Sequence, residues 1–192
     1  MDDSLVLTLH NLATSHATLA TLDTVIAESG IFLLPLALLL VWFRTASAGL
    51  GPREAVLTGF VAAALAFGVG YMLEQLLSRP RPFVALGLTP LFAHAADSSF
   101  PSDHTLLSVA LVGPLLWRLP RVGIWLFGWA MLIGMARVAA GVHYPSDVVG
   151  SAILALAIDA LVWLALRPVL ARVRLTRWDV DPPGSLPGAR RR

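Results

Sequence analysis

Cysteine and lysine are both absent from this chain of 192 residues, and charged side chains of any kind are scarce. Without cysteine, the chain can form neither disulfide bonds nor thiolate metal sites. All 14 basic residues are therefore arginine, which stays charged in any environment and can bind phosphate oxygens through two parallel hydrogen bonds. Charged residues make up 14% of the chain, against a soluble average of about 25%, which argues against a soluble domain.

Apolar residues are abundant instead. They make up 57% of the chain, and the mean hydropathy is +0.75. Apolar runs of about 20 residues, the length that crosses a bilayer, recur along the sequence. Residues 3–17 are more weakly apolar and favour an interfacial helix, with a sixth span as the alternative. We expect an all-α integral membrane bundle with about five transmembrane helices, over residues 22–43, 54–77, 102–118, 120–139 and 146–167.

The composition changes near residue 167. We expect one membrane domain over residues 1–167 and a basic tail over residues 168–192, which turns rich in proline and glycine and ends in consecutive arginines. The tail is predicted to be partly disordered and to meet anionic membrane lipids rather than nucleic acid. Arginines also flank the connections that five spans place on the same side as this tail. Because arginine-rich loops stay in the cytoplasm, we expect an N-out, C-in topology.

The opposite face keeps only Arg79, Arg81 and Arg137. An arginine at the end of a long apolar run costs free energy, so an anion is expected to compensate for it. For Arg79, a side chain that snorkels to the lipid headgroups is an equally good interpretation. The same topology brings three further polar residues to this face: His104, His143 and Asp147. This convergence on one face predicts a functional site.

Two segments of this face carry the chemistry. Pro145 favours a helix start, which leaves His143 just outside the helix and Asp147 in its first turn. A carboxylate within reach of one imidazole nitrogen fixes the tautomer and leaves the other nitrogen free to attack. The alternative is an interfacial histidine that binds a helix-capping aspartate.

The second segment runs from Pro101 to His104. Ser102 is predicted to be the N-cap of a helix, whose free N–H groups form an anion site. His104 in the first turn is a candidate general acid for a departing oxygen. The alternative is an ordinary helix start with an incidental histidine. His94, in the preceding loop, has no visible partner in the sequence.

In order along the chain, these motifs resemble the signature of the type 2 phosphatidic acid phosphatase family of membrane lipid phosphatases: Arg81-Pro82, Pro101-Ser102-Asp103-His104, then Arg137, His143 and Asp147. Residues 100–104 and 141–147 resemble the bacitracin-resistance-type undecaprenyl diphosphate phosphatases of that family. Three positions depart from the family pattern. Glu74 stands in place of a lysine, Ala136 in place of a serine and Asp103 in place of a glycine.

The resemblance implies a phosphatase that needs neither metal nor cofactor, in the bacterial cytoplasmic membrane, with its active site facing outward. His143 would attack the terminal phosphorus of undecaprenyl diphosphate to form a phosphohistidine, Asp147 would orient it, and His104 would protonate the leaving lipid monophosphate. The phosphoryl oxygens would be held by Arg81, Arg137 and the Ser102–Asp103 backbone, with Arg79 as a candidate substitute for the missing lysine. The Asp103 side chain would cap the helix or bind Arg79 or Arg81.

Other functions remain open at this point. Related phosphatases with nearly identical motifs would act on phosphatidylglycerophosphate, phosphatidic acid or lipid A phosphate. A non-enzymatic anion transporter would spread charged groups across the membrane depth, whereas here only Asp159 lies deep. A metal site is less favoured, because the neighbouring arginines repel a cation. The third span, about 25 Å long, is shorter than the ~30 Å apolar core, so its start would lie near the headgroups of a lipid substrate.

Overall fold

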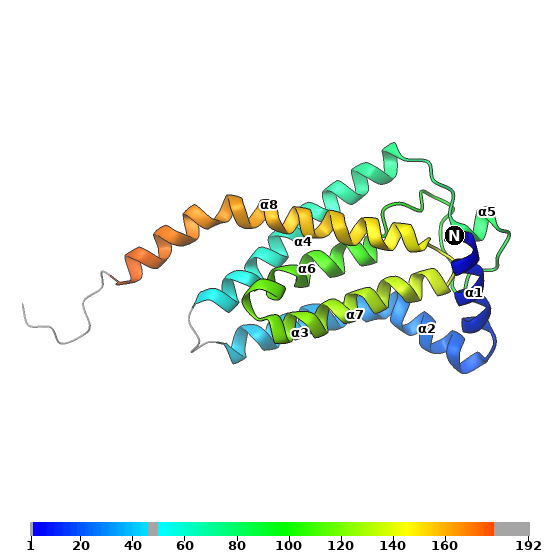
Figure 1. Cartoon of the computed structure of the whole chain (residues 1–192), viewed down its shortest axis with the longest axis horizontal. Coiled ribbons are helices and arrows are strands. Elements are labelled where there is room, and N and C mark those ends of the chain that lie inside the picture. The colour runs from blue at the N-terminus through cyan, green and yellow to red at the C-terminus, as the bar shows by residue number, and fades with distance from the viewer. Residues whose placement is uncertain (1, 46–49, 179–192) are drawn as a thin grey trace, which may run out of the picture.

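The computed structural model describes residues 2–45 and 50–178, with side chains for residues 2–45 and 51–169. The described residues are almost entirely helical, and they contain an isolated bridge between Pro80 and Ser98 but no strand. The elements are α1 (Asp2–Thr14), α2 (Ala17–Ser29), the 3₁₀ turn η1 (Gly30–Phe32), α3 (Leu33–Arg44), α4 (Leu50–Leu76), α5 (Pro82–Ala85), α6 (Asp103–Arg118), α7 (Pro120–Ala139) and α8 (Pro145–Trp178). The predicted all-α bundle is confirmed (Figure 1).

Four helical stretches are long and apolar enough to cross a membrane: Ala17–Arg44, Gly51–Leu76, Pro120–Ala139 and Pro145–Val169. They lie close to four of the predicted spans. The fifth, α6, begins and ends within one residue of its predicted bounds, but its 16 residues are fewer than the ~20 that cross a bilayer. This helix is instead enclosed by its neighbours.

Helix α6 packs against α4, α7 and α8, and the ribbon shows it between them (Figure 1). Its buried apolar face includes Leu106, Val109, Val112 and Leu115, all 0% exposed and spaced by three residues, as one face of a helix requires. Helix α4 comes close to this face at Gly59, where a Cβ atom would lie 2.3 Å from the carbonyl oxygen of Leu111. Because protein surrounds α6, this helix need not be long enough to span the lipid by itself.

The outer surface of the bundle is apolar. Phe32 is 73% exposed and Trp125 is 82% exposed, and many other large apolar side chains are similarly open. Such a surface is costly in water and is typical of contact with lipid or with a partner. Together with the four spans, it makes this a multi-pass membrane protein.

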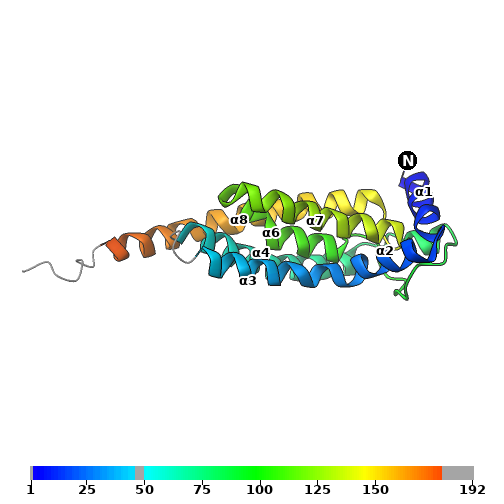
Figure 2. The same ribbon diagram turned by 90° about the horizontal axis from the view of Figure 1, so that it is seen from below.

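Helices α1 and α5 and the loop over residues 77–81 and 86–102 gather at one end of the bundle (Figure 1). Helix α1 lies across the bundle axis (Figure 2), and its buried Val6 packs with Val138, Tyr144 and Val148. A helix therefore occupies most of residues 3–17, as α1. With 13 residues, it is too short to be the sixth span.

Helix α8 continues to Trp178 with Pro168 inside it, so the domain boundary predicted after residue 167 does not coincide with a helix end. Proline removes one helical hydrogen bond, but the leucine, alanine and arginine residues that follow favour a helix. The remainder of the predicted tail, residues 179–192, lies outside the described residues.

Candidate active site

Backbone hydrogen bonds fold the loop after α4 onto the turn between α7 and α8. The Phe83 N–H donates to the Gly141 carbonyl at 3.0 Å and the Leu91 N–H donates to the Ala140 carbonyl at 3.2 Å. Within the loop, the Ser99 N–H donates to the Arg79 carbonyl at 2.8 Å. Gly141 has a φ of +83°, a conformation that favours glycine. These contacts bring three arginines and two histidines, distant in sequence, to the same end of the bundle.

His143 is buried, with 1% of its surface exposed. Its Nδ1 lies 2.7 Å from the Ser99 carbonyl oxygen, so Nδ1 carries the proton and Nε2 carries the lone pair. Arg81 Nη1 approaches that Nε2 at 3.2 Å. Burial, followed by the positive charges of Arg137 and Arg81, lowers the pKa of His143 well below its usual value. The imidazole is therefore neutral, with its unprotonated nitrogen facing a cation.

Asp147 is fully buried and supports His143 through an intermediary. Its Oδ2 accepts hydrogen bonds from the Ser99 hydroxyl at 2.5 Å and from the Tyr144 N–H at 2.8 Å. The distance from Oδ2 to His143 Nδ1 is 3.9 Å, which is too long for a hydrogen bond. The direct contact expected from the sequence is thus replaced by Ser99, whose hydroxyl binds Asp147 while its carbonyl binds His143.

The position of Asp147 explains this difference. It is the third residue of α8, and its side chain reaches back to the N–H of Tyr144, which precedes the helix, as in a capping box. The capping part of the alternative is therefore present in the structure, but the capping aspartate does not bind His143 directly. The same carboxylate caps α8 and anchors Ser99.

Arg79 braces this carboxylate from the other side. Its Nη1 donates to Asp147 Oδ1 at 2.5 Å and to Ser146 at 2.9 Å, and its Nη2 donates to Asp2 at 3.1 Å. The guanidinium also lies 4.3 Å from the centre of the Tyr144 ring. These contacts favour a supporting role for Arg79 over a direct phosphate contact in place of the missing lysine.

Arg81 is buried and held by three groups. It donates to Asp97 at 2.6 Å and to the Val142 carbonyl at 3.1 Å, and Glu74 lies 3.8 Å away. The glutamate in the family's lysine position therefore faces Arg81 as a distant ion-pair partner. Its charge is negative, whereas the lysine of the family pattern would be positive and could bind phosphate.

Arg137 differs from the other two site arginines. It is 4% exposed, its Nη2 lies 2.7 Å from His94 Nε2, and its Nη1 donates to the Ala27 carbonyl at 3.4 Å. Its Nε has no hydrogen-bond partner. A buried donor without a partner is costly, so Arg137 is well suited to bind an anion that enters the site.

The start of α6 completes the cluster. The Ser102 hydroxyl is 3.0 Å from that of Thr105 and makes no capping hydrogen bond to the backbone. The N–H groups of the first turn are thus not occupied by that side chain and can meet an anion. Asp103 forms no ion pair with an arginine among the described residues, and half-buried His104 lies within electrostatic range of Arg137.

This arrangement of residues matches a known family over much of the chain. The family described as the PAP2 superfamily matches residues 55–169, which include all of these arginines and histidines. The chain belongs to the PAP2 superfamily.

Individual relatives agree with this assignment. This PAP2 protein is 34% identical over 155 residues to undecaprenyl-diphosphatase BcrC of Bacillus subtilis, covering 80% of this chain and 78% of the relative. It is 31% identical over 150 residues to the bacitracin transport permease protein BcrC of Bacillus licheniformis, covering 76% and 71%. Its fold resembles the crystal structure of Aquifex aeolicus LpxE with a TM-score of 0.64 and 26% identity, covering 81% and 93%. The protein is a phosphatase of the PAP2 type.

Two residues of this PAP2 site were not identified from its sequence. Ser99 links Asp147 to His143, and His94, which had no visible partner, contacts Arg137. Both lie in the irregular loop before α6, where no periodicity relates a residue to the helices that it will contact. The only available signal was their proximity to the Pro101–His104 motif.

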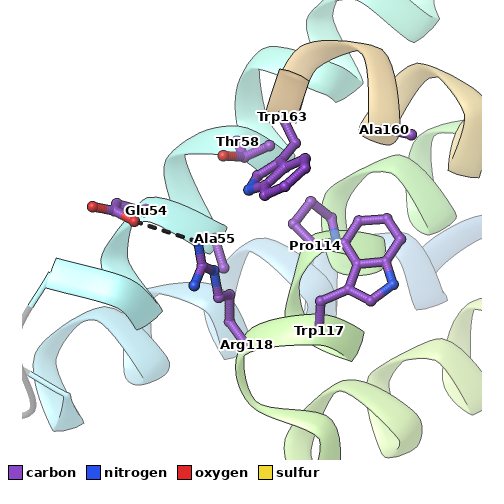
Figure 3. A pocket seen from close by; sticks show the side chains of 8 residues that line it. All are labelled: Glu54, Ala55, Thr58, Pro114, Trp117, Arg118, Ala160 and Trp163. Atoms are coloured by element: carbon purple, nitrogen blue, oxygen red, sulfur yellow. Dashed lines mark ion pairs between the residues drawn. The ribbon is translucent and has the colours of Figure 1, made fainter. Parts of the chain in front are cut away.

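The described residues of the PAP2 protein contain no group of three or more histidine, aspartate or glutamate side chains that could hold a metal ion. A cavity of about 390 Å³ lies at the far end of α6, near Trp117 and Arg118, and not at the histidines. Figure 3 shows Trp117, Pro114 and Trp163 around this space, with the ion pair of Arg118 and Glu54 at its side. This cavity is therefore separate from the phosphatase site.

Proposed function

We propose that this PAP2 phosphatase hydrolyses undecaprenyl diphosphate to undecaprenyl phosphate and inorganic phosphate through a phosphohistidine on His143. The observation that carries the proposal is the state of His143, which is buried and neutral, with Nδ1–H donated to Ser99 and Nε2 facing Arg81. A neutral imidazole with one nitrogen fixed as a donor is prepared for nucleophilic attack by the other. The names of the relatives support the choice of substrate.

The first step breaks the bond between the terminal phosphorus and the bridging oxygen. His143 Nε2 supplies the electron pair to phosphorus, and the leaving undecaprenyl phosphate takes a proton from His104. Arg137, with its unpartnered Nε, and Arg81 hold the equatorial oxygens, where charge builds up in the transition state. The Asp103 N–H in the first turn of α6 adds a hydrogen bond to the same oxygens. The Ser102 N–H, expected from the sequence to do the same, instead donates to the Ser151 hydroxyl at 2.8 Å.

The second step returns the enzyme to its starting state. A water attacks the phosphohistidine, His104 accepts its proton, and inorganic phosphate leaves with the electron pair of the P–N bond returned to Nε2. Asp147 stabilises the positive charge that His143 carries while phosphorylated, acting through Ser99. The step needs one water and no external oxidant or reductant.

The place of the site in the bundle supports a lipid substrate. It lies at the end where α1 crosses the bundle axis (Figure 2), at the start of α6, so a phosphate at headgroup depth can reach it while its chain remains in the apolar layer. We place this end on the outer face of the bacterial cytoplasmic membrane, because arginine-rich segments flank the opposite end.

The test is phosphate release by purified protein in detergent with EDTA, from undecaprenyl diphosphate, phosphatidic acid, phosphatidylglycerophosphate and lipid A phosphate. Wild type is expected to release phosphate fastest from undecaprenyl diphosphate, and His143→Gln is expected to release none. His16→Gln, which changes an exposed histidine outside the site, is the matched control and should behave as wild type.

Substrate labelled with ³²P on the terminal phosphate is expected to leave an acid-labile, base-stable label on wild type only. Faster release from another lipid phosphate would replace the substrate and keep the mechanism. No release from any lipid would reject the enzymatic proposal and would favour a transport function. The second relative is named a bacitracin transport permease protein.

A further inference from the structure

The three site arginines differ in the charge of their partners. Arg79 and Arg81 are each paired with carboxylates: Arg79 with Asp147 and Asp2, and Arg81 with Asp97 and Glu74. Within the described residues, Arg137 forms no such ion pair. A carboxylate partner offsets much of the charge that an arginine can offer to phosphate, so Arg137 retains the most.

Arg137 is nevertheless held in place, by uncharged groups. His94 Nε2 lies 2.7 Å from its Nη2, the Ala27 carbonyl accepts from Nη1 at 3.4 Å, and the Phe92 ring centre lies 5.4 Å from the guanidinium carbon. The shortest of these contacts is the one to His94. Phe92 and His94 come from the same loop. Phe92 packs on the Arg137 guanidinium, and His94 accepts its hydrogen bond.

The hydrogen bonds of His94 define its tautomer. An arginine can only donate, so Nε2 accepts from Arg137, and Nδ1 carries the proton toward the Ala95 carbonyl at 3.2 Å. Burial, followed by the positive charge of Arg81, lowers the pKa of His94 below its usual value. The imidazole is therefore neutral at pH 7 and can serve as an acceptor.

We propose that His94 is a positioning residue, which holds Arg137 through an uncharged acceptor so that the guanidinium keeps its full charge for the phosphoryl group. Aspartate or glutamate would orient the same guanidinium but would also cancel its charge and repel a phosphate. The His94 and His143 ring centres are 6.3 Å apart, so the guanidinium held by His94 is next to the nucleophile. The identity of the phosphate substrate in this inference rests on the proposed function. The contact between His94 and Arg137 does not depend on it.

The test compares His94→Gln with His94→Glu. Both side chains can bring an oxygen close to the position of Nε2, and they differ in charge. We expect His94→Gln to bind orthovanadate, a phosphate analogue, within about threefold of wild type, and His94→Glu to bind about 10- to 100-fold more weakly, the range for a charge-assisted hydrogen bond. Binding is measured by titration calorimetry in detergent, and melting temperatures verify that both variants are folded.

Steady-state kinetics on undecaprenyl diphosphate gives a second readout. His94→Glu is expected to lower kcat/KM by a similar factor, and His94→Gln to restore most of it. A merely structural role would move both variants together, so equal vanadate affinities for Gln and Glu would overturn the proposal. Failure of wild type to bind vanadate would also overturn it. If vanadate binding follows the charge of residue 94 while no lipid is hydrolysed, the inference stands and the proposed function fails.

Discussion

Ser99 is the residue through which Asp147 contacts His143, the proposed nucleophile. Its hydroxyl donates to Asp147 and its carbonyl accepts from His143, at 2.5 and 2.7 Å. The carboxylate thus fixes the position of a backbone carbonyl, and that carbonyl fixes the imidazole tautomer. A substitution at either end of this series of hydrogen bonds is expected to change the orientation of His143 for attack more than the affinity for substrate.

We predict that Ser99→Ala lowers kcat about 10-fold with little change in KM, and that Asp147→Asn lowers kcat about 100-fold. Because Ser99 and Asp147 act on His143 through the same series of hydrogen bonds, the double variant should be no slower than Asp147→Asn alone. Ser98→Ala is the matched control, since the Ser98 hydroxyl donates to the Phe100 carbonyl and not to Asp147. Losses that multiply in the double variant would show that the residues act separately.

The pKa of His143 gives a prediction on pH. Burial and the charges of Arg137 and Arg81 lower this pKa in the folded protein, whereas the unfolded value is about 6.5. The contribution of neutral His143 to the free energy of unfolding is fully present above pH ~6.5. It decreases as the pH falls below that value, because the unfolded chain then binds a proton that the folded protein does not.

Nitrogen NMR of ¹⁵N-histidine protein can follow this titration without substrate. We expect His143 to remain the Nδ1–H tautomer from pH 8 down to about 6.5, a limit set by its unperturbed pKa. Its signals are those missing from His143→Gln. A His143 midpoint at or above the unperturbed value of about 6.5 would contradict the proposed charge state.

At the level of whole elements, hydropathy predicted most of the bundle. The apolar runs predicted four membrane-crossing stretches and the bounds of α6, because a backbone in lipid must satisfy its own hydrogen bonds as a helix. The motifs identified His143, His104 and Arg137 as candidates because the helix ends that carry them face the same side.

The sequence did not reveal how these side chains are paired. Glu74 facing Arg81, and His94 beside Arg137, are contacts between a loop and distant helix ends. Such contacts depend on how the loop folds over the bundle, which no local periodicity specifies. Helix α8 also continues past the change in composition near residue 167, because the residues after Pro168 favour a helix.

Close packing of α4 on α6 gives a prediction for a pair of glycines in α4. At Gly59 a Cβ atom would lie 2.3 Å from the Leu111 carbonyl oxygen, a backbone atom that cannot move aside, whereas at Gly68 it would meet nothing within 4 Å. Gly59→Ala should therefore destabilise the protein by about 1–3 kcal/mol. Gly68→Ala should be neutral or slightly stabilising, since alanine favours helix.

Thermal unfolding in detergent, followed by circular dichroism, compares the two variants. Because α6 carries His104 in its first turn, a displaced α6 should also reduce phosphate release by Gly59→Ala. Equal melting temperatures for the two variants would mean that α4 and α6 pack less closely than the structure shows.

At the level of the whole molecule, the arginines give the bundle two different ends. The site end holds Arg79, Arg81 and Arg137 among carboxylates and histidines. The other end carries arginines at the start of α4, around the α6–α7 turn and along the last turns of α8. Since positive loops are retained in the cytoplasm, the second end should face inward and the phosphatase site outward.

Absence of cysteine allows a direct test of this orientation, because any thiol in the chain must be one that was introduced. Thr89→Cys lies in the exposed loop at the site end, and Val122→Cys lies at the opposite end, in the first turn of α7, where Val122 is 39% exposed. In intact cells, a membrane-impermeant maleimide should label the first variant and not the second. After permeabilisation both should react, which controls for accessibility. Labelling of Val122→Cys alone in intact cells would invert the topology and place the hydrolysis of lipid diphosphate on the cytoplasmic face.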